Sequence, residues 1–156
     1  MNYNIDPENL SVREYKTMLK KQNLLPGRRI LWQDIDKNFE SFEKHGINTV
    51  EQLRKCLSAP AKLAAFAAEN SISEEYLVIL KREIGSLVQK PVPLNSFPGI
   101  DPSLIAELND SGVKTSKDYF EKNPTSSDEI FCLCDLVRIN GVGAVAARVF
   151  YEAGYK

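Results

Sequence analysis

The apolar residues of the chain recur at intervals of three and four, which predicts short amphipathic helices. No segment shows the strict alternation that a half-buried strand requires. The first helix is expected to begin after Ser11, whose hydroxyl can cap it while Glu14 reaches back, and to end before Pro26-Gly27. Its apolar stripe consists of Val12, Tyr15 and Leu19. The hydrophobic pattern therefore predicts an all-α protein.

Caps and glycines set the bounds of the next helices. A helical region from about residue 28 to 45 is expected to end at Gly46, because glycine adopts the left-handed conformation that terminates helices. Thr49 starts the following helix with a capping box. Either Ser71 or Ser73 caps a later one.

The sequence KPVP at residues 90–93 is the clearest boundary, because its two prolines remove backbone donors and favour extended geometry. Beyond it the helix signals recur: an N-cap at Asp101 before a first-turn proline, another at Thr115, and a third at Ser126 or Ser127. We therefore expect three parts. They are a helical arm at 1–25, a unit at 26–90 and a unit at 91–156.

The helical units also repeat in register. Gly46 and Gly112 lie 66 residues apart, as do Thr49 and Thr115. Within the second half, LNSFPGIDPSLIAELNDSG aligns with LVRINGVGAVAARVFYEAG at a spacing of 42. Each copy reads as helix, tight turn, helix and glycine stop. The last copy stops at Lys156, where a GxxT continuation is expected, which is consistent with a truncated chain.

The stretch RINGVGAVAAR at residues 138–148 has the spacing of a helix-hairpin-helix turn. Apolar residues close the hairpin, two glycines relieve the turn, and Ala147 lets the two helices approach. With FEKHGINTVEQL upstream, residues 28–156 resemble a bacterial domain-of-unknown-function family numbered 4332, which belongs to the helix-hairpin-helix group. GINTVEQL is also similar to the C-terminal domain of the RNA polymerase alpha subunit. The resemblance implies tandem, orthogonally packed short-helix hairpins of the SAM/helix-hairpin-helix type.

The resemblance also implies a function for the turn. In DNA-binding members such hairpins aim backbone N–H groups at a phosphate, without reading bases. Here the donors would lie in the turn that comprises Gly141, Val142, Gly143 and Ala144, with Arg138 and Arg148 as supplementary charges. The alternative is that the glycines only allow two helices to pack. Two other copies depart from the pattern, since PGIDPS places Asp101 at the second glycine and LWQDID lacks both glycines.

The charge distribution indicates a second candidate surface. The formal net charge is −1, which does not favour binding to nucleic acid by bulk electrostatics. Residues 91–156 carry six basic and nine acidic side chains, whereas residues 13–29 hold only one acid, Glu14. The strongest candidates for contact with an anionic partner in that segment are Lys20, Lys21, Arg28 and Arg29. Trp32 nearby is expected to anchor a hairpin, or else to stack on a base or a partner.

The remaining chemistry favours a binding protein over an enzyme. Cys56, Cys132 and Cys134 lack zinc spacing and are expected to be buried thiols, and His45 has no nucleophile near it. We expect no cofactor, no metal site, no membrane segment and a cytoplasmic location. The leading hypothesis is a module that binds DNA or RNA backbone. Its rival is a protein-interaction scaffold in which the hairpins are purely structural.

Overall fold

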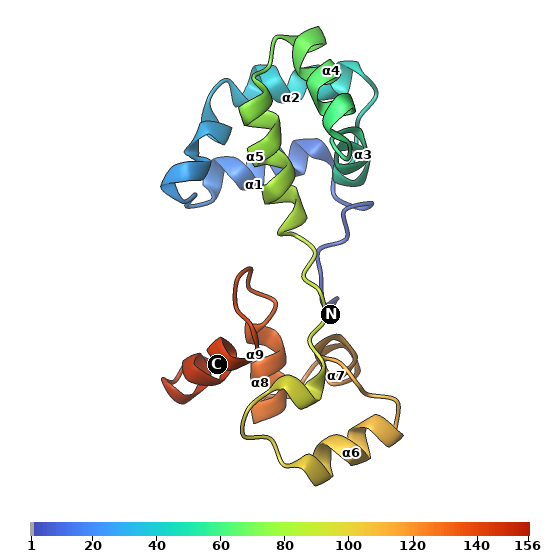
Figure 1. The fold of residues 1–156 in the computed structure, drawn as a ribbon, viewed down its shortest axis with the longest axis vertical. Coiled ribbons are helices and arrows are strands. Elements are labelled where there is room, and N and C mark those ends of the chain that lie inside the picture. Colours follow the sequence, from blue (N-terminus) through green and yellow to red (C-terminus); the bar gives the residue numbers. More distant parts are fainter. Residues whose placement is uncertain (1) are drawn as a thin grey trace. The chain divides into compact units, whose positions relative to one another are not determined.

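The computed structural model describes residues 2–156, and that part of the chain is helical without strands (Figure 1). The all-α prediction is therefore confirmed. Residues 5–88 form one compact unit, here called the first unit. The second unit consists of residues 89–156 together with the N-terminal residues up to Asn4.

The first unit is a bundle of short helices around one apolar core. Its core residues come from every helix of the unit and include the expected stripe of the first helix. Ser11 and Thr49 both form the predicted capping boxes, and Gly46 has the predicted positive φ of 73°. The elements are α1 (Val12–Lys21), η1 (Pro26–Trp32), α2 (Ile35–Lys44), α3 (Val50–Cys56), α4 (Pro60–Asn70) and α5 (Glu74–Gly85).

Two details of the first unit differ from the prediction. The helical region expected at about 28–45 is interrupted, because Asp34 lies in the left-handed conformation with φ 48° and separates η1 from α2. Its apolar residues nevertheless keep one face toward the core, which is why periodicity alone did not reveal the break. Of the two serines proposed to cap α5, Ser73 does so by accepting from the Tyr76 N–H, whereas Ser71 forms the left-handed turn.

The second unit has its own separate apolar core. Asp101 and Thr115 cap their helices as predicted. The cap of α8 is a correction: Asp128, and not Ser126 or Ser127, accepts the Phe131 N–H at 2.8 Å. Asp128 directly precedes Glu129, the first residue of α8, and therefore occupies the N-cap position itself. The elements are η2 (Leu94–Ser96), α6 (Pro102–Asp110), α7 (Ser116–Lys122), α8 (Glu129–Leu136) and α9 (Ala144–Glu152).

The segment 1–25, expected as a separate arm, is divided between the two units. Helix α1 lies in the core of the first unit, where Leu19 is fully buried. Tyr3 is buried in the second unit, with its hydroxyl 2.8 Å from the Ser116 hydroxyl and its ring against Phe120. Burial of these side chains removes their apolar surface from water, which holds both pieces to the units instead of leaving an arm.

Each unit joins its entering chain segment to the start of a capped helix by a short antiparallel bridge. In the first unit the bridge pairs Ser11 with Thr49, and two backbone hydrogen bonds of 2.9 Å flank it. In the second unit it pairs Pro93 with Thr115, flanked by bonds of 3.0 and 2.8 Å. The start of α1 and the start of η2 therefore occupy the same place relative to the capping threonine.

Candidate interaction surface around the last hairpin

The turn between α8 and α9 is open to solvent. The Val142 N–H donates to the Ile139 carbonyl at 3.0 Å, and Gly141 has φ 86°. This left-handed conformation is costly for any residue with a Cβ. Gly141 and Gly143 are exposed, and a Cβ built on either meets no atom within 4 Å. Packing around the turn therefore leaves room for a ligand to approach.

The first amides of α9 have no partner in the described part of the chain. Gly143 is the N-cap and has no side chain to accept a hydrogen bond. No hydrogen bond is formed by the N–H groups of Gly143, Ala144, Val145 or Ala146 to any described residue. Phosphate binding at this turn requires amides that are not already hydrogen-bonded, and these N–H groups meet that requirement. These amides are the positive end of the helix dipole.

The two arginines expected to assist the hairpin are occupied within the second unit. Arg138 donates to the Tyr3 carbonyl at 2.9 Å, pairs with Asp135, and lies 4.3 Å above the centre of the Phe120 ring. Arg148 has a side chain only 12% exposed. These contacts make both side chains structural cross-links and leave little of their charge for a ligand.

Arg148 also explains the geometry of the other turn of this unit, at residues 97–100. Its Nε donates to the Pro98 carbonyl at 2.6 Å, and its Nη1 pairs with Glu129. A Cβ on Gly99, whose φ is 82°, would lie 3.2 Å from the guanidinium carbon. Glycine is therefore required there both for the backbone conformation and for the approach of the arginine. The Arg148 side chain therefore holds helix α9 against the 97–100 turn.

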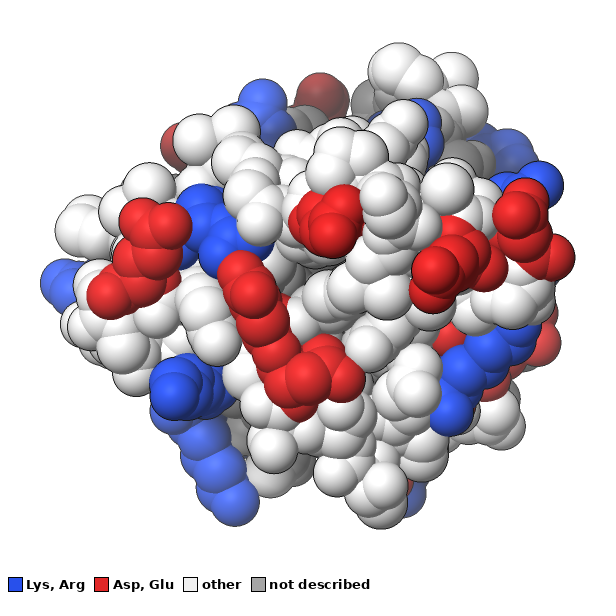
Figure 2. Space-filling model, turned by 90° about the horizontal axis from the view of Figure 1, so that it is seen from below, with Lys and Arg blue, Asp and Glu red and all other residues white. Residues whose placement is uncertain are grey.

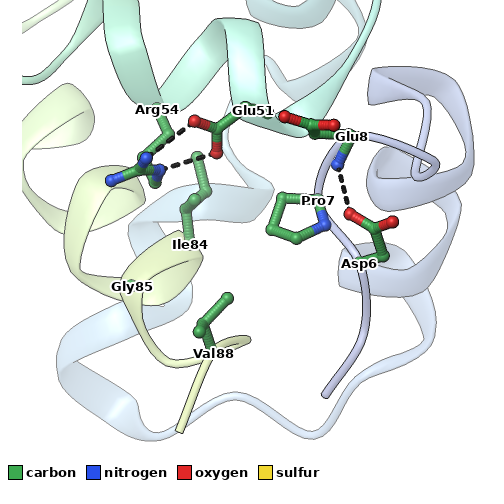
Figure 3. Close-up of a pocket in the computed structure, with 8 residues that line it drawn as sticks. All are labelled: Asp6, Pro7, Glu8, Glu51, Arg54, Ile84, Gly85 and Val88. Atoms are coloured by element: carbon green, nitrogen blue, oxygen red, sulfur yellow. Dashed lines mark hydrogen bonds and ion pairs between the residues drawn. The ribbon is translucent and has the colours of Figure 1, made fainter. Parts of the chain in front are cut away.

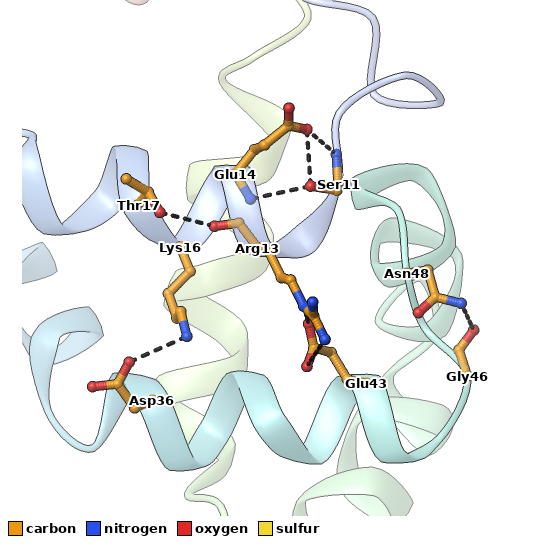
Figure 4. A network of polar contacts seen from close by, with 9 residues as sticks. All are labelled: Ser11, Arg13, Glu14, Lys16, Thr17, Asp36, Glu43, Gly46 and Asn48. Carbon is orange, nitrogen blue, oxygen red and sulfur yellow. Dashed lines mark hydrogen bonds and ion pairs between the residues drawn. The ribbon is translucent and has the colours of Figure 1, made fainter.

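Acids from other helices neutralise most of the basic segment at residues 13–29. Figure 4 shows the pairs made by Arg13 and Lys16. Arg13 pairs with Glu43 of α2, and both Lys16 and Lys20 pair with Asp36 at 3.2 and 2.7 Å. These acids hold the segment against α2. The hydrogen bonds from the two lysines lower the pKa of Asp36, so the carboxylate is charged near neutral pH.

The other basic residues proposed in that segment differ in whether an acid pairs with them. Arg28 pairs with Glu83 of α5, a carboxylate that is only 4% exposed. Arg29 donates to the Leu24 carbonyl at 3.3 Å, and Lys21 forms no ion pair with a described residue. The ten proposed binding residues thus belong to two units, four of them in the first and six in the second. Each group is therefore a separate candidate surface within its own unit.

Trp32 behaves as an anchor. Its indole N–H donates to the Leu19 carbonyl at 2.8 Å, which joins η1 to α1. The side chain is 38% exposed, so part of the ring remains in contact with solvent. Of the two hypotheses for this residue, its hydrogen bond supports the structural one.

Helix α9 carries an apolar face that no described element of its own unit covers. Val145 and Val149, one turn apart, are 67% and 60% exposed, and Phe150 beside them is 40% exposed. The Phe150 ring packs edge-on against the Tyr155 ring at 5.9 Å, so the patch extends past the helix. Sequence reasoning missed this surface, although the scarcity of charges in AVAARVFYEA is its signal. Exposed apolar residues that adjoin one another are typical of binding surfaces.

A hollow of about 510 Å³ lies in the first unit between the N-terminal segment, α3 and the end of α5 (Figure 3). Ile84 and Val88 supply apolar lining. Arg54 donates two hydrogen bonds of 2.8 and 2.7 Å to Glu51. Both oxygens of the Glu51 carboxylate therefore already have a partner. The eight described residues that line it include three acids, Asp6, Glu8 and Glu51, but no histidine, cysteine or serine.

The cysteine thiols are buried or half-buried, and the histidine ring contacts the backbone of its own helix. Cys132 and Cys134 are buried and unpaired, as predicted, and Cys56 is half-buried. Burial raises the pKa of the Cys134 thiol to about 12, which keeps it protonated and unreactive. The His45 ring nitrogen Nδ1 lies 2.8 Å from the Ser41 carbonyl. Within residues 2–156 no three histidine, cysteine or acidic side chains cluster as metal ligands would.

Comparison with protein-family models, curated proteins and solved structures gives no match. None of the helices described here combines the length and apolar character needed to cross a membrane.

In the view of Figure 2, acidic and basic side chains are interspersed among uncharged ones, without a continuous basic band. The α9 face and the adjoining open hairpin are therefore the strongest candidates for a site.

Proposed function

We propose that this chain is a non-enzymatic protein-interaction module built from helix-hairpin-helix-like units, and that its α9 face binds a short apolar helical segment of another protein. The observation that carries the proposal is the exposure of Val145, Val149 and Phe150 on one helix face. Burial of such side chains stabilises a complex by about 25 cal/mol for each Å² of apolar area removed from water.

The first unit indicates what kind of partner fits. Helix α5 also follows a left-handed turn residue and an N-cap, as α9 does, but η1 lies across it. The Tyr76 hydroxyl, on the third residue of α5, donates to the Leu31 carbonyl of η1 at 3.1 Å. Leu80, the seventh residue, is fully buried, whereas the seventh residue of α9 is the exposed Phe150.

No element of the described second unit corresponds to η1, because η2 leads directly into the 97–100 turn. The positions of α9 that match those under η1 are Ala146, Phe150 and Ala153, which are small or apolar. A helical segment of one or two turns with leucine-like side chains therefore suits this face. The matching bridges at Thr49 and Thr115 support the same comparison of the two units.

A peptide with the sequence of residues 23–33 of this chain, which contains η1, is the most direct probe. In a titration followed by NMR, it should shift the amide signals of α9. A single short segment is expected to bind with a Kd of about 1 mM, or about 4 kcal/mol. Phe150→Glu should abolish the shifts, whereas Lys117→Glu, on the surface of α7, should leave them unchanged. Absence of shifts on α9 at saturating peptide would overturn the proposal.

The N–H groups of Gly143–Ala146, which form no hydrogen bond to a described residue, favour a second candidate, the binding of nucleic-acid backbone. Fluorescence anisotropy with labelled single- and double-stranded DNA and RNA tests it at low and moderate salt. Binding that salt weakens and that Gly143→Asp abolishes would support this candidate and count against the protein partner. Loss only on removal of the Lys20 and Lys21 charges would exclude the hairpin as the contact. No binding at low salt would exclude the candidate.

A further inference from the structure

The turn before α9 contains the one place in the sequence where glycine follows asparagine, Asn140-Gly141. Both residues are exposed. In the described part of the chain, the Asn140 side chain forms no hydrogen bond and the Gly141 N–H has no acceptor. The side-chain amide is thus free to rotate beside an unengaged backbone nitrogen. These are the two groups that react when asparagine loses ammonia.

We infer that Asn140 is a site of spontaneous deamidation. The Gly141 nitrogen attacks Cγ of Asn140 and forms the new C–N bond of a five-membered succinimide. The bond from Cγ to the side-chain nitrogen breaks, and that nitrogen leaves as ammonia with the proton of the Gly141 amide. Water then opens the ring at either carbonyl and yields aspartate or isoaspartate. Glycine favours the attack because no Cβ crowds the nucleophilic nitrogen. No other part of the described chain crowds it either, since a Cβ built on Gly141 would meet no atom within 4 Å.

The first unit contains a matched position that should react more slowly. Asn70 precedes Ser71, which is also left-handed, with φ 54°, in the turn before α5. There the following residue has a side chain, and the Asn70 Nδ2 is held by the Phe66 carbonyl at 3.0 Å. Asn70 lies at the end of α4, so its backbone is also fixed by the helix. Asn70 thus differs from Asn140 in three respects that should each slow the reaction: the following side chain, the bound side-chain amide and the helical backbone.

The reaction would alter the candidate surface irreversibly. Isoaspartate adds a methylene to the main chain inside the turn that the hydrogen bond from Val142 to Ile139 closes. Either product also places a new carboxylate in the turn that leads to the uncapped start of α9. We therefore expect the deamidated protein to differ in the conformation of the 139–143 turn, whatever partner α9 binds.

The test is incubation of the full chain in mildly alkaline buffer, followed by peptide mapping, ammonia release and enzymatic methylation of isoaspartate. Asn140 should react at least about tenfold faster than Asn70, a difference of about 1.4 kcal/mol in the barrier. Gly141→Ala should slow the reaction. Because that substitution strains the turn, Asn140→Ser is a second variant, and it should remove the fast phase of ammonia release.

Equal rates at Asn140 and Asn70 in the folded protein would overturn the inference. So would a fast phase of ammonia release that persists in Asn140→Ser. Neither outcome bears on peptide binding by α9, which is measured on freshly prepared protein.

Discussion

The ion pair between Arg28 and Glu83 should contribute to the stability with which η1 is held on α5, together with the hydrogen bond from Tyr76 to Leu31. Glu83 is 4% exposed, and its other side-chain partner is the Gln22 amide at 3.2 Å. Arg28→Ala would leave a buried carboxylate with that one neutral donor. Loss of one partner of a buried pair costs about 3–5 kcal/mol. The Arg28 side chain is 30% exposed, so water can reach the carboxylate, and we expect a loss of about 2–3 kcal/mol.

Urea unfolding followed by Trp32 fluorescence measures this loss, because the one tryptophan of the chain lies in η1. With a slope of about 1–3 kcal/mol per molar urea, the midpoint should fall by about 0.7–3 M. Arg13→Ala is the matched control, since Arg13 also pairs with a glutamate but is 79% exposed. It should leave the midpoint nearly unchanged.

Equal midpoints for the two variants would refute the reasoning, because burial would then make no difference to the pair. Replacement of both Arg28 and Glu83 by leucine gives a further check. It should recover much of the stability, since no charge is left buried without a partner.

Four further predictions concern the second unit. Thr115→Ala should cost about 1 kcal/mol in urea unfolding through loss of the capping box. Gly141→Ala should lower the free energy of unfolding by about 1 kcal/mol in the same measurement, because Gly141 has a positive φ. Gly27→Ala should leave it nearly unchanged. Burial opposes ionisation of Asp128, but hydrogen bonds outweigh it and lower the pKa of that carboxyl. Its stabilisation relative to Asp128→Asn should thus be full at neutral pH and disappear as the pH falls below about 4. Cys134 should resist a thiol reagent until the chain is unfolded, and rapid labelling of the native protein would contradict its burial.

Much of the local structure was predictable from the sequence. Short-range rules were sufficient for the capping boxes at Ser11, Thr49 and Thr115, and for the left-handed glycines at 46, 112 and 141. These features depend on hydrogen bonds and steric limits within a few residues of one another, so the chain encodes them directly. The break at Asp34 escaped prediction because an aspartate with positive φ has no comparably clear signal.

The candidate site depended on contacts between distant residues. The charge of Arg28 meets a buried acid 55 residues away, and Arg148 is used to clamp the 97–100 turn. The exposure of Val145 and Phe150 likewise follows from the lack of a covering element, which periodicity cannot reveal. By itself, then, the sequence determined the helices and the open glycine turn, because their causes are local. Only the tertiary structure decided which charges and which apolar face remain available, because burial and ion pairing depend on how the helices pack.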